Sequence, residues 1–239
     1  MSVLKGVAFN NFDPRELPAY TPTEAAGYLR VPLSTLRTWV YGYTPQPKSS
    51  VKRIPAIIRV PSTQSYLLSF YNLVEAHVLS SIRREHAIPL AKVRLAVKYV
   101  EDKSGVARPL ANQRFETDGA DLFIRSLGDL INVSSGGQVA FEKLLRVYLK
   151  RIEWDGKGLA SRLFPYVRHG VPDVEQSRSI LMDATISGGR PVLAGTGIAT
   201  RVVSERFMAG ESAEDLAADY GRQLADIHEA IRFEHRPAA

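Results

Sequence analysis

A pair of short amphipathic segments, separated by a three-residue break, restricts the fold of this chain more than any other feature. Residues 20–41 read "YTPTEAAGYLRVPLSTLRTWVY". Thr21 or Thr23 can cap a first helix, because a short hydroxyl side chain accepts a hydrogen bond from the free N–H groups of the first turn. Arg30-Val31-Pro32 ends that helix, and residues 33–40 place apolar side chains at the i, i+3, i+4 spacing of a second one. Two short helices joined by a tight turn form a helix-turn-helix pattern.

The second helix and the segment after it carry the side chains expected to meet a polyanion. Short hydroxyls and a guanidinium suit phosphates and base edges in a major groove. Residues 44–60 combine turn formers, cations and a β-rich end, which is typical of a basic β-wing. The expected DNA-binding residues are Ser34, Thr35, Arg37, Thr38 and Tyr41 on the helix, and Lys48, Lys52 and Arg53 on the wing.

The charge is distributed unevenly along the chain. Residues 1–60 carry eight Lys and Arg against three Asp and Glu, whereas residues 181–239 carry six against nine. A basic front and an acidic back favour a polyanionic partner at one end and a different partner at the other. The alternative is an ordinary solvated surface with uneven patches.

Residues 67–103 predict two further helices, broken at Ile88-Pro89. Together with "YTPTEAAGYLRVPLSTLRTWV" and the wing, the stretch "LLSFYNLVEAHVLSSIRREHAIPLAKVRLAV" resembles the MerR-like winged helix-turn-helix family over residues 20–103. The resemblance implies DNA binding through residues 34–41 and the wing. A degenerate helix-turn-helix used for protein contacts is the alternative.

The middle of the chain, residues 104–178, carries weaker signals. It predicts short strands, a turn at residues 134–137, a helix over residues 138–151, and a strand that ends in a hairpin turn after Trp154. Asp118, Asp121 and Asp129 lie close in sequence and could form a metal site of a nuclease. Turn propensity explains the stretch "TDGAD" as well, and no further ligand follows at a diagnostic spacing. We therefore predict no metal site and no catalytic residues.

The stretch "GGRPVLAGTGIAT" at residues 188–200 looks at first like a phosphate-binding loop. Position 200 is Thr where a dinucleotide fingerprint needs Gly, and no Lys-Ser or Lys-Thr pair follows. We predict no cofactor, and a structural turn role for Gly188, Gly189, Gly195 and Gly197. Three helices are expected downstream, over residues 200–208, 213–220 and 224–233, with Leu224, Ile227, Ala230 and Ile231 facing inward.

Residues 179–233 resemble a second family, the domain of unknown function 433. The shared pattern is a hairpin with G-R-P-x-x-x-G-T, followed by a helical bundle with G-x-S-x-E-x-L and a late D-I. Here Gly197-Ile198 replaces the family's usual Arg-Ile. That family is associated with antitoxins paired with PIN-domain ribonucleases, and the whole arrangement resembles a VapB-type antitoxin of mycobacterial type.

The C-terminal helices are acidic, which argues against a second DNA reader because phosphates repel carboxylates. Such a face suits a basic groove of a toxin or dimer packing, and an ordinary solvated acidic surface is the alternative. The candidate toxin-binding residues are Glu211, Glu214, Asp215 and Asp219.

We therefore predict a mainly α protein with small β-elements (α+β), divided into residues 1–103, 104–178 and 179–239. The expected function is that of an antitoxin, not an enzyme, that neutralises a PIN-domain (VapC-type) ribonuclease toxin and binds operator DNA as a homodimer to autoregulate its operon. The chain has no cysteine and no apolar run long enough to span a bilayer, so a cytoplasmic protein is expected. A stand-alone MerR-like regulator that senses a small ligand, and a metal-dependent nuclease, are the alternatives.

Overall fold

The computed structural model describes residues 13–44, 53–62, 67–85, 88–131, 135–167 and 177–235. These described residues contain nine α-helices and two antiparallel sheets of two strands each. The predicted fold class, mainly α with small β-elements, is confirmed.

The predicted helix-turn-helix is present as α1 (Pro22–Leu29) and α2 (Leu33–Tyr41). Thr21 is the residue that caps α1: its hydroxyl accepts a hydrogen bond from the N–H of Glu24 (3.2 Å), and the Glu24 carboxylate accepts one from the N–H of Thr21 (2.8 Å). Arg30, in the left-handed conformation with φ of 53°, then ends α1. This capping box and this sharp turn fix where the two helices begin and end.

The predicted β-wing is reduced to one bridge in the described residues. Tyr43 and Ile54 exchange backbone hydrogen bonds of 2.9 and 2.8 Å. The β-rich stretch that follows forms no strand, so this part of the expectation was wrong. Instead the N–H groups of Ile57 and Ile58 donate to the carbonyl of Trp39 in α2, because burial of Ile58 (1% exposed) pulls the segment onto the helix. Lys48 and Lys52 lie outside the described residues.

The next two helices, α3 (Phe70–Glu85) and α4 (Leu90–Ser104), confirm the predicted pair and its break. Short strands expected in the middle segment are replaced before residue 132 by a π-helical turn (Phe115–Gly119) and α5 (Ala120–Ile131). The reason is packing: Phe123, Ile124 and Leu127 are buried at helical spacing, and α5 packs along α4.

After α5, α6 runs over Ser135–Leu149 and so begins three residues before the expected start at residue 138. The predicted strand and hairpin after it are confirmed as β1 (Ile152–Trp154) and β2 (Ala160–Leu163). Asp155 shapes the hairpin turn, because its carboxylate accepts hydrogen bonds from the N–H groups of Lys157 and Leu159 (2.8 and 2.9 Å).

The C-terminal part contains β3 (Ile180–Leu181), β4 (Val192–Leu193), α7 (Thr200–Met208), α8 (Ala213–Tyr220) and α9 (Leu224–Glu234). All three predicted helices are confirmed. Leu224 is 37% exposed, so its predicted inward position was wrong. It stands at the first residue of α9, before the helix meets its neighbours, whereas Ile227, Ala230 and Ile231 are buried as predicted.

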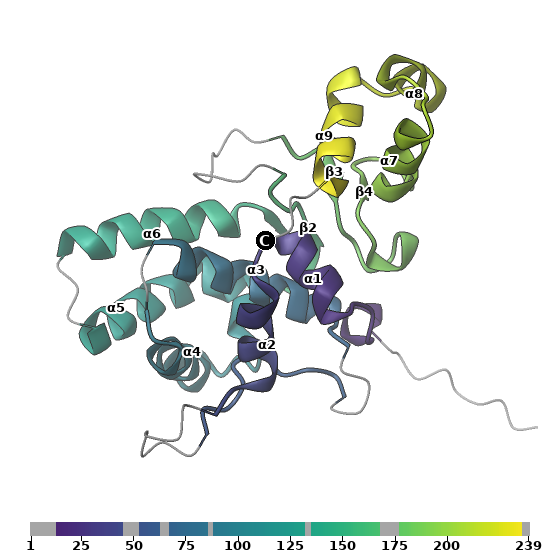
Figure 1. Ribbon diagram of the computed structural model, residues 1–239. Helices are drawn as coiled ribbons and strands as arrows, with labels where there is room; N and C mark the ends of the chain where they lie inside the picture. The colour runs from purple at the N-terminus through teal and green to yellow at the C-terminus, as the bar shows by residue number, and fades with distance from the viewer. Residues whose placement is uncertain are drawn as a thin grey trace, which may run out of the picture.

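The buried apolar side chains form two main clusters. The larger one joins the helix-turn-helix to the middle segment and extends from Tyr20 to Met182. The smaller one lies among β3, β4, α7, α8 and α9, and Tyr28 of α1 packs against both. Figure 1 shows α7, α8 and α9 as a group of their own near α1. The division at residues 103/104 and 178/179 stays a prediction.

Candidate nucleic-acid interface

The outward face of α2 carries part of the predicted DNA-binding set. Ser34 and Arg37 are exposed, and Thr38 and Tyr41 are half-buried. The Thr38 hydroxyl donates to the Ser34 carbonyl one turn earlier (2.8 Å). Arg37 is the one cation within α2, and its exposed position would let a guanidinium reach base edges.

The prediction that Thr35 belongs to the DNA-binding residues was wrong. It is 3% exposed and belongs to the inner side of α2, next to the buried Leu36 and one turn before the buried Trp39. Residues four apart lie on the same side of a helix, so Thr35 follows Trp39 into the interior. Its side chain cannot meet a ligand at the surface.

Arg53 ties the segment after α2 to the end of that helix. Its guanidinium donates to the carbonyl of Tyr41 (3.1 Å), where the partial negative charge of a helix C-terminus favours a cation. Gly42 lets the backbone of Ile54 pack closely against the end of α2. Its φ is 71°, and a Cβ at this position would lie 2.3 Å from the carbonyl oxygen of Ile54. The two elements expected to touch DNA are thus fixed to each other.

Two arginines outside the predicted DNA-binding set tie the same segment to α4. Arg94 of α4 donates to the carbonyl of Pro55 (3.2 Å), and Arg59 forms an ion pair with Glu101 of α4 (2.6 Å). Their contacts join segments about 40 residues apart, so no local pattern could have indicated them.

The glycine-rich stretch contacts the helix-turn-helix itself. The buried phenol of Tyr20 donates a hydrogen bond to the carbonyl of Gly189 (2.9 Å). Gly189 has φ of 80°, and a Cβ at this position would lie 2.2 Å from the Tyr20 oxygen. Glycine is required here for backbone conformation and for the close approach of a neighbouring side chain.

The neighbouring Arg190 completes the contact with α1. Its guanidinium forms an ion pair with Glu24 (2.7 Å) and lies 5.7 Å from the centre of the Tyr20 ring. Burial raises the pKa of Glu24, but hydrogen bonds from Thr21 and the charge of Arg190 outweigh it and lower the pKa overall. Through this ion pair the loop joins the C-terminal hairpin to the helix-turn-helix.

Two further contacts strengthen this junction. Tyr28 of α1 stacks on Phe233 of α9, with ring centres 6.2 Å apart and an interplanar angle of 11°. Arg30 donates to the carbonyls of Tyr166 (3.2 Å) and Arg232 (3.5 Å). Tyr28 and Arg30, at the C-terminal end of α1, thus add contacts with α9 and with Tyr166.

The other predicted turn glycines differ in their conformation. Gly188 and Gly189 belong to a short 3-10 turn (Ser187–Gly189) between β3 and β4. Gly188 and Gly195 have positive φ values of 60° and 77°. Gly197 does not have a positive φ, so its backbone does not require glycine.

The predicted acidic surface is partly neutralised within the domain. Arg206 forms ion pairs with Glu211 (2.5 Å) and Asp219 (2.6 Å), and the Arg206 hydrogen bond lowers the pKa of Glu211. Asp215 accepts a hydrogen bond from the hydroxyl of its capping residue Ser212 (2.5 Å). Glu214 is exposed. Among the described residues, neither Glu214 nor Asp215 forms an ion pair.

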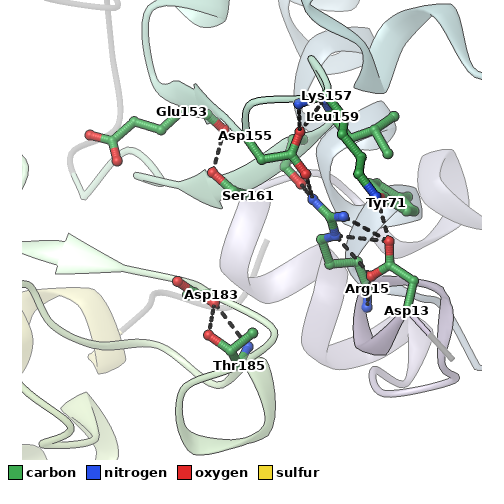
Figure 2. A network of polar contacts seen from close by, with 11 residues as sticks. Asp13, Arg15, Tyr71, Glu153, Asp155, Lys157, Leu159, Ser161, Asp183 and Thr185 are labelled. Carbon is green, nitrogen blue, oxygen red and sulfur yellow. Dashed lines mark hydrogen bonds and ion pairs between the residues drawn. The ribbon is translucent and has the colours of Figure 1, made fainter. Parts of the chain in front are cut away.

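A polar network joins the start of the described chain to the β1–β2 hairpin (Figure 2). Arg15 forms ion pairs with Asp13 (2.8 Å) and Asp155 (2.7 Å), and Tyr71 donates to Asp13 (3.0 Å). A cavity of about 480 Å³ lies between this network, the hairpin and the loop after β3. Most charges that line the cavity are paired with one another.

Asp118, Asp121 and Asp129, the candidate metal ligands, do not form a metal-binding group in the described structure. Asp121 forms an ion pair with Arg146 (2.8 Å). Within the described parts of the chain, no three His, Cys, Asp or Glu side chains are placed to hold a metal ion together. No helix in those parts is long and apolar enough to cross a membrane.

A helix-turn-helix that contacts a small C-terminal hairpin and its three helices through its first helix is an arrangement typical of a DNA-binding protein. The sequence profile of the family described as "Putative DNA-binding HTH domain" matches residues 18–97, and that of "Protein of unknown function (DUF433)" matches residues 180–233. The chain is 31% identical over 235 residues to "Putative antitoxin VapB45" of Mycobacterium tuberculosis, covering 90% of this chain and 95% of the relative. The chain therefore belongs to the VapB-type antitoxin family.

Two other proteins of Mycobacterium tuberculosis are similar along most of their length. "Uncharacterized protein Rv2308" is 25% identical over 223 residues, which cover 90% of this chain and 89% of that protein. The crystal structure of Rv2018 has a TM-score of 0.64 at 24% identity and covers 92% of this chain and 99% of that one. At this identity the likeness shows a shared fold.

Proposed function

We propose that the protein is the antitoxin of a type II toxin-antitoxin system, which binds operator DNA through α2 and the following segment and neutralises a PIN-domain ribonuclease through its C-terminal domain. The observation that carries the DNA-binding half is the exposed Arg37 on α2, the second helix of the helix-turn-helix. The antitoxin half is supported by family membership and by the exposed carboxylates of α8.

Arg37 and Arg53 would have different tasks. A guanidinium in the major groove can donate two hydrogen bonds to guanine and so distinguish sequences. Arg53, held at the C-terminal end of α2, is placed beside the helix and would contact a phosphate, which adds affinity for every sequence alike. Operators with two-fold symmetry favour a homodimer, in which each protomer reads one half-site.

Glu214 and Asp215 would attract a basic groove of the ribonuclease. Complementary charge of this kind speeds association and fixes orientation more than it raises affinity. Glu211 and Asp219 contribute less to this attraction than the sequence alone suggested, because Arg206 offsets their charge.

The junction between α1 and the C-terminal domain makes one body of the DNA-reading helices and the proposed toxin-binding domain. The ion pair of Arg190 with Glu24 and the stacking of Tyr28 on Phe233 fix the two parts to each other. The antitoxin–toxin complex itself would then bind the operator, which is the arrangement that autoregulation needs.

Two measurements test the proposal. Purification of the chain co-expressed with the product of the neighbouring reading frame should yield a complex with a PIN-domain ribonuclease whose RNA cleavage is inhibited. If the chain purifies alone and does not inhibit that product, the alternative of a ligand-sensing regulator, with the cavity beside Arg15 as its site, gains support.

The second measurement is the salt dependence of binding to the DNA upstream of the chain's own gene. Arg53→Ala should weaken binding and reduce the slope of log affinity against log salt by about one, because one phosphate contact is lost. The matched control is Arg125→Ala, an exposed arginine of α5 that should leave the slope unchanged. An unchanged slope for Arg53→Ala would contradict the assigned phosphate contact.

A further inference from the structure

Helix α4 carries two large apolar side chains that the described residues cover only in part, with Lys103 of the same helix lying 5.8 Å from the centre of the Tyr99 ring. Its inner side, with Val93, Ala96, Val97 and Val100, is buried in the larger core. On the outer side Leu95 is 48% exposed and Tyr99 is 40% exposed. Two large apolar side chains four residues apart on one helix lie side by side, so they form one patch.

Charged residues flank this patch at the spacing of a coiled-coil seam. Lys92, Leu95, Tyr99 and Asp102 are separated by three, four and three residues, which places all four along one stripe of the helix. Neither Lys92 nor Asp102 is in an ion pair among the described residues.

The stripe is complementary to a second copy of itself in one orientation. If two α4 helices pack antiparallel, position 92 of one copy faces position 102 of the other, and position 95 faces position 99, because both pairs share a centre at position 97. Each Lys92 then meets an Asp102 carboxylate, and each Leu95 meets a Tyr99 ring. Parallel packing would instead place Lys92 against Lys92 and Asp102 against Asp102, which is repulsive.

We propose that α4 is the homodimer interface, formed by antiparallel packing of Lys92, Leu95, Tyr99 and Asp102 against the same residues of a second copy. A two-fold axis near position 97 makes this contact isologous, as expected for a closed dimer. The inference rests on the proposed operator binding, which calls for two copies. The hydrogen bond from Arg94 to the Pro55 carbonyl links this interface helix to the segment beside α2. Dimerisation would therefore fix the spacing of the two DNA-reading helices.

A charge exchange in the full chain tests the interface by sedimentation equilibrium. Asp102→Lys places two lysines opposite each other at both ends of the seam and should raise the dimer dissociation constant about tenfold or more. The double variant Lys92→Asp with Asp102→Lys restores opposite charges and should return to within about threefold of the unaltered chain. Asp129→Lys, an equal change of charge at an exposed residue of α5, is the matched control and should have no effect.

Cross-linking provides a second readout, because the chain contains no cysteine. An equal mixture of the single variants Leu95→Cys and Tyr99→Cys should form disulfide-linked dimers under mild oxidation more readily than either variant alone. Dimers that persist unchanged in Asp102→Lys, or a charge exchange that fails to restore them, would overturn the proposal. A protein that is monomeric yet binds operator DNA would overturn this interface while leaving the proposed DNA binding in place.

Discussion

The phenol of Tyr20 donates a hydrogen bond to the carbonyl of Gly189, 169 residues further along the chain (2.9 Å). Tyr20 is fully buried, so its ring cannot retreat from its neighbour. This contact explains why glycine stands at position 189 of the stretch that in sequence looked like a phosphate loop. It brings the backbone of the C-terminal domain against the start of the helix-turn-helix.

Gly189→Ala should therefore destabilise the protein strongly. The positive φ of 80° strains any L-residue, and the added Cβ would lie 2.2 Å from the Tyr20 oxygen. We expect a loss of about 2–5 kcal/mol in the free energy of unfolding, from left-handed strain of about 1–2 kcal/mol and overpacking of about 1–3 kcal/mol. Urea denaturation measures the loss.

The neighbouring Gly188 is the matched control, since its φ is 60° and a Cβ there meets no atom within 4 Å. Gly188→Ala should cost about 1–2 kcal/mol, from backbone strain alone. Equal losses for the two substitutions would show that the contact with Tyr20 contributes nothing.

The network around Arg15 should make stability depend on pH (Figure 2). Burial raises the pKa values of Asp13 and Asp155, but hydrogen bonds outweigh it: Arg15 and Tyr71 act on Asp13, and Leu159, Arg15 and Lys157 act on Asp155. Both pKa values are lower in the folded protein than in the unfolded chain. The two groups therefore stabilise the fold above the ordinary Asp pKa of about 4, and this stabilisation is lost as the pH falls through the lowered folded values.

Asp155→Asn isolates the contribution of one carboxylate. The amide oxygen can still accept from the N–H groups of Lys157 and Leu159, but the charge opposite Arg15 is lost. We expect about 1–2 kcal/mol less stability near neutral pH and a smaller drop in acid, measured by urea denaturation at several pH values. Asp129→Asn, an exposed control on α5, should match the unaltered chain, and an undiminished acid drop in Asp155→Asn would refute the assignment.

The acidic C-terminal surface allows two opposite changes in the rate of toxin association. Glu214→Lys should slow association with the proposed ribonuclease, because it reverses an exposed charge. Arg206→Ala should speed it, because Glu211 and Asp219 lose the cation that offsets them. Stopped-flow mixing at low salt measures both rates. Changes in the same direction for the two variants would argue against attraction by this surface.

The sequence predicted those elements whose signals are local. The Thr21 cap and the break at Pro32 define α1 and α2, and Ser212 defines the start of α8. The prediction of short strands in the middle segment was wrong because Asp118 and Gly119 are typical turn residues. Packing of Phe123 and Leu127 in the larger core makes the region helical instead. The apolar spacing of "LFIRSLGDLI" is the local signal for this helix, and the turn-forming residues before it obscure that signal.

The candidate site was predictable only in part, for the same physical reason. Exposed Arg37 follows from helical periodicity, and periodicity should also have placed Thr35 inside, one turn before Trp39. The fastening of Arg190 to Glu24 and the pairing of Arg206 with Asp219 depend on tertiary contacts. No pattern within either segment encodes the partner of such a charge.

The measurement that tests the central claim most directly is a fluorescence anisotropy titration of operator and scrambled duplexes with the unaltered chain, Arg37→Ala and the control Arg125→Ala. If Arg37 reads base edges, Arg37→Ala should lose about 1–3 kcal/mol of binding free energy on the operator and far less on the scrambled duplex. Arg125→Ala should bind both duplexes as the unaltered chain does. An equal loss on the two duplexes, or no loss on either, would contradict sequence reading by the exposed face of α2.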